Sequence, residues 1–319
     1  MRRGVGVALL CVATVGVVAA VGYGVLTGSD SPFGPAEECA ATVGDQRVDL
    51  TIEQAENASL ITAIGVRRGF PARAASIALA AAYQESDLYN LESGDRDSLG
   101  LFQQRPSQGW GEPEEILDPV YATNAFYDAL AQVEGYEALE ITVAAQQVQR
   151  SGFPTAYADH EDDARALASA LTGNSGGTFS CELDGDADEA EDRLTDSGLV
   201  QRADVVRQEA EGMFGDLTLG GFTPGGVTEG HMTGSTHYEG RAVDIFLRPL
   251  NEANNVRGWA IAHYLVAQAE RLDIQTVIFD DRIWKSGEDD GWRDYDPPSR
   301  SGDPAILEHR DHVHVDVFD

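Results

Sequence analysis

The chain has 319 residues, enough for about two domains of ordinary size. Asp and Glu number 54 against 22 Lys and Arg, which gives a formal net charge of -32. A sequence this acidic offers no basic stripe to neutralise phosphates, so nucleic acid is excluded as a partner. Its hydrophobic content of 42% also excludes wholesale disorder.

An uncharged run at residues 4–26 follows Arg2 and Arg3. As a helix, these 23 residues would be about 35 Å long, and a hydrocarbon core is about 30 Å thick. The basic pair should stay in the cytoplasm. We therefore expect residues 1–28 to anchor the chain in the cytoplasmic membrane by a single pass, with everything after them outside. The alternative is a cleaved signal peptide and a secreted protein, which small residues near Ala19 and Ala20 would permit.

Two of the three cysteines, Cys39 and Cys181, lie beyond this run, and Cys11 lies inside it. Either reading of the N-terminus exports the chain to an oxidising compartment, where an even pair of cysteines is expected to bond. The pair brackets the helical segment described next. We predict a disulfide that closes this segment.

The pattern of apolar residues divides the exported chain. Residues 29–47 form a short spacer. Residues 48–172 show apolar positions three and four apart, as in the Ala-rich run at 74–82, which predicts helices. Residues 173–193 contain a Gly-rich stretch and then an acidic one without apolar period, which is typical of a linker. Residues 194–319 mix predicted helices with predicted strands: helices at 202–214 and 256–272, strands at 217–222, 242–247, 276–279 and 312–318.

The predicted helix that starts after Pro71 carries Glu85 near its end. Ile77, Ala81 and Glu85 are four apart, so the carboxyl group continues an apolar stripe. Burial there would raise its pKa toward the range of a general acid. Fifteen residues later, residues 100–104 read GLFQQ.

A Glu-Ser pair followed by Gly-Leu-x-Gln resembles the catalytic segment of lytic transglycosylases and goose-type lysozymes. The resemblance covers about residues 50–172 and implies an all-α lysozyme-like domain. In it, Glu85 would be catalytic, and we assign Gln103 and Gln104 to substrate binding. Asp87 faces away from Glu85, and Asp95 and Asp97 are the other carboxylates nearby. Chemistry that relies on one glutamate therefore fits better than hydrolysis by two carboxylates.

Five of the seven histidines fall in two short segments near the C-terminus. The odd spacing of His237 and Asp244 cannot place both on one face of one strand, but a turn at Gly240 lets His237 reach back from a loop. His312 and His314 share a face of the last strand. His237, Asp244 and His314 would then supply two nitrogens and one carboxylate to a metal, with a fourth position left for water.

Residues 236–245, THYEGRAVDI, look like the zinc-binding segment of hedgehog signalling domains, which share a fold with bacterial D-Ala-D-Ala carboxypeptidases and related endopeptidases. That group is marked by a His, an Asp seven residues later and a final His-x-His. The resemblance covers about residues 218–319 and implies an α+β domain that binds Zn²⁺ through His237, Asp244 and His314.

The same resemblance suggests catalytic roles around the metal. His231 and His312 match histidines that polarise substrate or water. The general base is open between Glu308 and His309, with His312 a further candidate. Residues 217–222 lack the arginine with which the carboxypeptidases hold a terminal carboxylate, so cleavage within a peptide is favoured.

Both resemblances indicate peptidoglycan as the partner. We expect a cell-wall remodelling enzyme that combines cleavage of glycan strands, as in lytic transglycosylases, with zinc-dependent cleavage of stem or cross-link peptides. The alternative is a non-catalytic peptidoglycan-binding, signalling or assembly protein that retains the zinc site.

Overall fold

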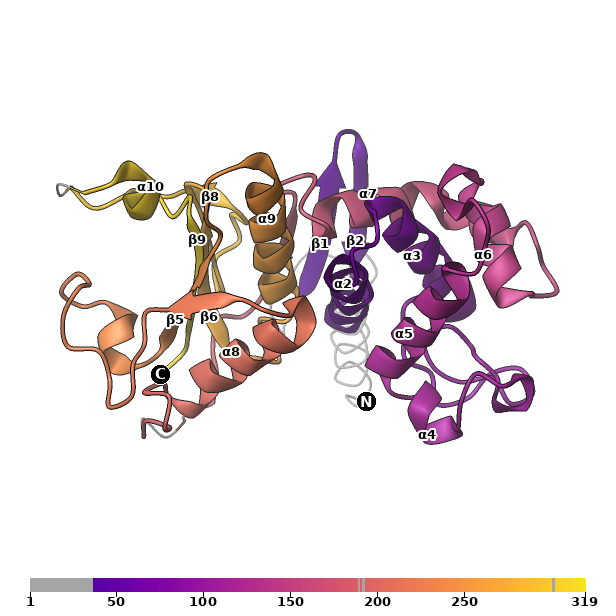
Figure 1. The fold of residues 1–319 in the computed structure, drawn as a ribbon, viewed down its shortest axis with the longest axis horizontal. Coiled ribbons are helices and arrows are strands. Elements are labelled where there is room, and N and C mark those ends of the chain that lie inside the picture. Colours follow the sequence, from indigo (N-terminus) through magenta and orange to yellow (C-terminus); the bar gives the residue numbers. More distant parts are fainter. Residues whose placement is uncertain (1–36, 189, 191–192, 300–301) are drawn as a thin grey trace, which may run out of the picture. The chain divides into compact units, whose positions relative to one another are not determined.

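The structure is a computed structural model that describes residues 37–188, 190, 193–299 and 302–319. Residues Glu38–Asp319 form one compact unit. In chain order (Figure 1), its elements are β1 (Glu38–Val43), β2 (Gln46–Leu50), α2 (Ile52–Arg67), α3 (Ala72–Ser86), η1 (Pro106–Gln108), α4 (Pro113–Ile116), α5 (Pro119–Leu130), η2 (Tyr136–Ala138), α6 (Ile141–Gln149), η3 (Ala156–His160), α7 (Glu161–Leu171), β3 (Phe179–Glu182), α8 (Gln201–Phe214), β4 (Thr218–Gly220), η4 (Thr236–Glu239), β5 (Ala242–Phe246), α9 (Glu252–Ala267), β6 (Ile274–Phe279), β7 (Arg282–Lys285), β8 (Arg293–Asp294), α10 (Pro304–Leu307) and β9 (His312–Val317).

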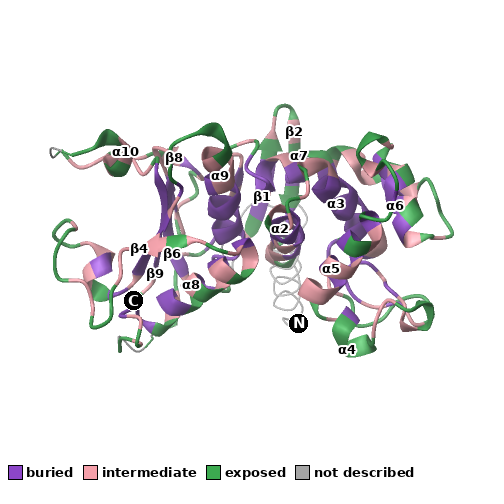
Figure 2. Ribbon diagram, in the orientation of Figure 1, coloured by how far each residue is buried: buried purple, intermediate pink, exposed green. Residues whose placement is uncertain are grey.

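The helical region is built around α3, which contacts α2, α5, α6 and α7. Most of α3 is buried, as Figure 2 shows, and seven of its fifteen residues are alanines that let neighbouring helices approach closely. Pro71 precedes its first turn, and Asp87 ends it in the left-handed conformation. The predicted helix from Pro71 to Glu85 is therefore present.

A small antiparallel sheet, in the order β2-β1-β3, lies beside these helices. Cys39 on β1 is directly opposite Cys181 on β3, and a disulfide joins them. All three strands differ from expectation, because β1 lies in the expected spacer, β2 runs from that spacer into the stretch expected to be helical, and β3 lies in the expected linker. The pairing of β1 with β3 joins cysteines that are 142 positions apart, a relation that local periodicity cannot reveal.

The second sheet has the order β4-β5-β9-β6-β7-β8, and every neighbouring pair is antiparallel. Helices α8 and α9 contact its strands, and the side chains of Val243, Ile245, Val313 and Val315 are buried on one face. The chain is thus mixed α/β, with a helical N-terminal region and two antiparallel sheets. The predicted strands at 217–222, 242–247, 276–279 and 312–318 correspond to β4, β5, β6 and β9.

Helix α9 joins the two regions, since it contacts α2, α7 and β3 as well as strands of the large sheet. Gln268, just after α9, donates hydrogen bonds to the carbonyl of Glu56 (3.0 Å) and the hydroxyl of Ser59 (2.8 Å). His263 on α9 is fully buried. Its Nδ1 donates to the Ala170 carbonyl at 2.8 Å, and its Nε2 accepts from the Gly177 N–H at 3.1 Å.

The prediction of a single-pass membrane protein has to be corrected. Within the described residues, no helix is both long and apolar enough to cross a bilayer. The longest, α2 and α9, have 16 residues each, which is about 24 Å and short of a hydrocarbon core. The run at residues 4–26, on which the prediction rested, lies outside the described residues. We withdraw the single-pass membrane anchor.

We predict that acid weakens the fold through His263. Burial lowers the pKa of its imidazole from 6.5 to about 4. The unfolded chain therefore binds more protons between these values, and stability is lost as pH falls from about 6.5 to about 4. The expected contribution is about 3 kcal/mol. Urea unfolding of His263→Gln across this range should lack this part of the pH slope, whereas His160→Gln should retain it. Equal slopes for the wild type and His263→Gln would contradict the prediction.

Candidate functional site

Pairing of β5 with β9 places the central side chains of the site opposite one another. In this register Asp244 faces His314, and Phe246 faces His312. Side chains two residues apart on a strand share a face, so the two histidines and the carboxylate project from the same side of the sheet. The valines between them point to the buried opposite face.

His237 reaches the same point from η4, whose N-cap is Ser235 and which ends at Gly240 in the left-handed conformation. The Nδ1 of His237 donates to the carbonyl of Gly221 at 2.8 Å. This bond places a proton on Nδ1 and directs Nε2 toward Asp244, so Nε2 is the nitrogen that could bind a metal ion when the ring is neutral. Gly221 is required there, because a Cβ on it would lie 2.2 Å from Cε1 of His237.

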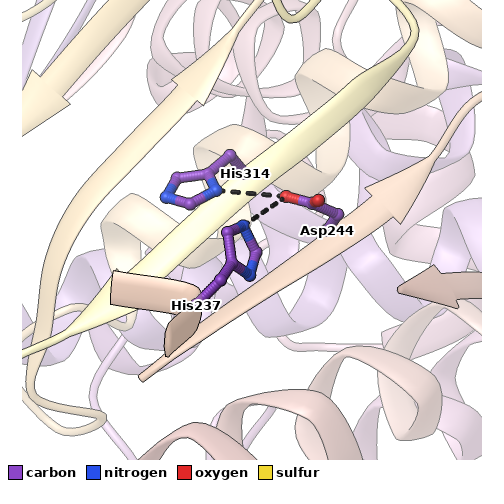
Figure 3. Close-up of side chains that lie close together, drawn as sticks. All are labelled: His237, Asp244 and His314. Atoms are coloured by element: carbon purple, nitrogen blue, oxygen red, sulfur yellow. Dashed lines mark hydrogen bonds and ion pairs between the residues drawn. The ribbon is translucent and has the colours of Figure 1, made fainter. Parts of the chain in front are cut away.

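The three side chains converge on one carboxylate oxygen (Figure 3). Oδ1 of Asp244 lies 3.2 Å from Nε2 of His237 and 3.1 Å from Nδ1 of His314. All three residues are buried, and one donor atom from each lies within 4.8 Å of the others. The group can therefore hold a metal ion.

The electrostatics of this cluster fit a cation. Burial alone would raise the pKa of Asp244, but hydrogen bonds from His237 and His314 outweigh it and hold that pKa far below its ordinary value. Burial likewise disfavours a charged His314, yet hydrogen bonds to Asp244 and Asp316 raise its pKa to about 10. The buried carboxylates thus demand a positive charge beside them, which a metal ion supplies as well as a proton does.

The cluster opens into a cavity of about 430 Å³ that three further histidines line. The His231 ring stacks on His237 at 4.0 Å, and the His309 ring lies 4.6 Å from His312 and 5.7 Å from His314. Burial, with His314 and His312 nearby, lowers the pKa of His309 to about 2, so it is neutral.

Of the candidates for the general base, His309 and His312 line the cavity, whereas Glu308 is not among its lining residues. The Glu308 carboxylate pairs instead with Arg310 at 2.9 Å. Nδ1 of His312 lies 2.7 Å from Oδ1 of Asp311. Asp311 therefore orients the His312 ring with its proton on Nδ1.

Sequence reasoning missed Gly221, Asp311 and Asp316. Asp316 is buried, lines the cavity and lies 3.3 Å from Nε2 of His314. The alternation of His312, His314 and Asp316 along one strand could have placed it on the polar face. Nothing in the sequence connects Gly221 to His237, and the adjacency of Asp311 and His312 does not by itself reveal that their side chains are in contact.

Glu85, near the end of α3, is half-buried in the helical region. Its Oε1 accepts a hydrogen bond from the Tyr157 hydroxyl at 2.6 Å. Burial raises the pKa of this carboxyl group, and hydrogen bonds from Tyr157 and Gln149 offset only part of the increase. Glu85 is thereby suited to hold and donate a proton. Tyr157 and Gln149 were not assigned roles from the sequence.

The Gly-Leu-Phe-Gln turn lies beside Glu85, because the Ser86 hydroxyl donates to the Leu101 carbonyl at 2.7 Å. Gln103 is half-buried in this turn. Gln104 is only 2% exposed and donates to the Ala122 carbonyl at 3.1 Å. Gln104 therefore stabilises the turn, and we do not retain a substrate contact for it. Oδ1 of Asp97 forms an ion pair with Nε of Arg105 at 2.7 Å.

Comparison with known proteins finds similarity in the C-terminal region. A family model described as VldE, C-terminal domain, matches residues 195–305. The match includes His237 and Asp244 and ends before His314. No curated protein matches the chain.

We predict that Gly221→Ala empties the metal site. The new Cβ would displace the His237 ring, and the left-handed conformation of Gly221, with φ of +79°, adds strain. Purified variant should contain far less metal than the wild type by elemental analysis. Gly215→Ala is the matched control, because Gly215 has φ of +78° with nothing within 4 Å of an added Cβ. Equal metal content in Gly221→Ala and wild type would refute the role of this residue.

Proposed function

We propose that the C-terminal region is a zinc-dependent peptidase that cleaves peptidoglycan peptides. The observation that carries the proposal is the buried group of His237, Asp244 and His314 at the base of a cavity. Two nitrogens and one carboxylate are ligands typical of catalytic zinc. A bound zinc ion supplies Lewis-acid activation of water and of the scissile carbonyl. The resemblance of residues 236–245 to zinc-binding segments of hedgehog and D-Ala-D-Ala peptidase domains supports the substrate class.

The side chains around the ligands supply proton transfer. Asp311 holds the proton of His312 on Nδ1, so Nε2, on the side of Asp244 (3.8 Å), is the nitrogen that can take a proton from water. His309 is neutral and lines the same cavity, so it can accept a hydrogen bond from the substrate. We assign His312 as the general base, which would take a proton from water and then give it to the leaving amine.

For the helical region we propose cleavage of glycan strands by Glu85 as general acid. The raised pKa of its carboxyl group favours this role, and the hydrogen bond from Tyr157 orients the carboxyl group. The Glu-Ser and Gly-Leu-x-Gln segments support a lytic-transglycosylase-like or lysozyme-like domain. The competing proposal is a wall-binding protein without turnover, and the digestion experiments below separate the two.

We predict that His237→Ala abolishes peptide cleavage, because it removes one of the two imidazole nitrogens that would bind the zinc ion. Peptidoglycan digested with the full-length chain should yield new peptide termini by mass spectrometry, and a chelator should suppress them. His160→Ala, which removes a histidine outside the cluster, should retain full activity. Peptide cleavage that persists in His237→Ala or in chelator would contradict the zinc mechanism.

We predict that Glu85→Gln lowers the release of glycan fragments by about 10²–10⁴-fold, since Gln keeps the shape but cannot transfer the proton. The wild-type rate should fall as pH rises through the raised pKa of Glu85, because the protonated acid is then lost. Glu56→Gln is the control, as burial also raises the pKa of Glu56 and we assign it no catalytic role. A protein that binds cell walls yet releases neither product would favour the binding alternative.

A further inference from the structure

The cavity above the metal ligands contains one permanently cationic side chain. Among its lining residues, all within the described part of the chain, Arg248 is the one arginine or lysine. The remaining lining is apolar, hydroxyl-bearing, imidazole or acidic. In a chain with a net charge of -32, a guanidinium in this cavity is a group that can distinguish anionic ligands from neutral ones.

Two neighbouring groups, Asp311 and Phe246, hold the side chain of Arg248. Its Nε and Nη2 lie 2.7 Å and 2.6 Å from Oδ2 of Asp311, and its guanidinium carbon lies 4.3 Å from the centre of the Phe246 ring. Asp311 is 4% exposed, whereas the side chain of Arg248 is 52% exposed. The guanidinium is thus fixed by the buried Asp311 carboxylate and the half-buried Phe246 ring, while much of the Arg248 side chain stays accessible to a ligand.

This arrangement connects Arg248 to the reacting centre. Asp311 binds Arg248 through Oδ2 and His312 through Oδ1. His312 in turn lies 3.8 Å from the metal-binding carboxylate of Asp244. An anion on Arg248 would therefore lie within the same cavity as the groups that transfer protons.

We propose that Arg248 binds a free carboxylate of the substrate, so that the site selects acidic peptides. The inference rests on the proposed peptidase function and adds the chemical class of its substrate. A guanidinium presents paired donors that match a carboxylate, and prior immobilisation by Asp311 and Phe246 reduces the entropy lost on binding. A purely structural Arg248, one that only neutralises Asp311, would not distinguish a carboxylate from an amide.

The test compares cross-link peptide fragments of peptidoglycan as free acids with the same fragments after their carboxylates are converted to amides. For the full-length, zinc-loaded wild type, kcat/KM should favour the acid about tenfold or more, as expected for a hydrogen bond to a charged group. Arg248→Gln should lose this preference and retain zinc. Arg282→Gln is the matched control, because Arg282 pairs with Asp294 on β7 and β8 and does not line the cavity. A preference that survives in Arg248→Gln overturns the proposal.

Binding separates this inference from the peptidase proposal. If the wild type cleaves neither form, calorimetry of the same fragments with the zinc-loaded protein supplies the readout. If the wild type binds the acid more tightly than the amide and Arg248→Gln loses this difference, the binding of a carboxylate by Arg248 is supported although the peptidase proposal fails. Equal Kd values for acid and amide overturn the proposed role of Arg248. If Arg248→Gln does not retain zinc, Arg248→Lys decides. A reduced preference supports the proposed role of Arg248, and an undiminished preference refutes it because lysine lacks the paired donors.

Discussion

The site depends on the pairing register of β5 and β9. Asp244 and His314 are cross-strand partners, and their hydrogen bond is buried. A shift of one residue would send His314 to the apolar face and Val313 or Val315 toward the cavity. The buried valines on the opposite face oppose such a shift, since it would bring them to the polar side. Packing of the sheet against α8 and α9 thus fixes the geometry of the side chains that could hold a metal ion, and His237 needs only a short turn to complete the set.

Helix α9 connects the packing of the large sheet to the packing of the helical region. It lies against strands β6 and β9 and also contacts α2, α7 and β3. The buried contacts of His263 and Gln268 cross between the two regions. The two groups for which we propose catalytic roles, Glu85 and the histidine cluster, therefore lie in regions that pack against each other. Substitutions in α9 should affect the stability of both regions, whereas substitutions of Glu85 or His237 alter local chemistry.

Elements with a strong local pattern were predicted well from the sequence. The Ala-rich run predicts α3, and alternating valines predict β9. Strands β1, β2 and β3 were missed because short strands acquire their stability from partners far along the chain, here across the Cys39–Cys181 pair. Strands β7 and β8 have four and two residues, too few for a period to be recognised. The ligand set was indicated by residue type and spacing, but the groups that orient it were not.

The sequence by itself determined the chemical identities in this protein: an acidic chain, five clustered histidines, a glutamate on an apolar helical stripe and two cysteines around a helical segment. These follow from residue type and short-range period, which need no knowledge of distant contacts. Only the tertiary structure decided that Gly221 holds His237, that Asp311 joins Arg248 to His312, that Tyr157 pairs with Glu85 and that Glu308 is absent from the cavity lining. Such pairings depend on how strands and helices far apart in the chain pack together, and local pattern carries no information about that.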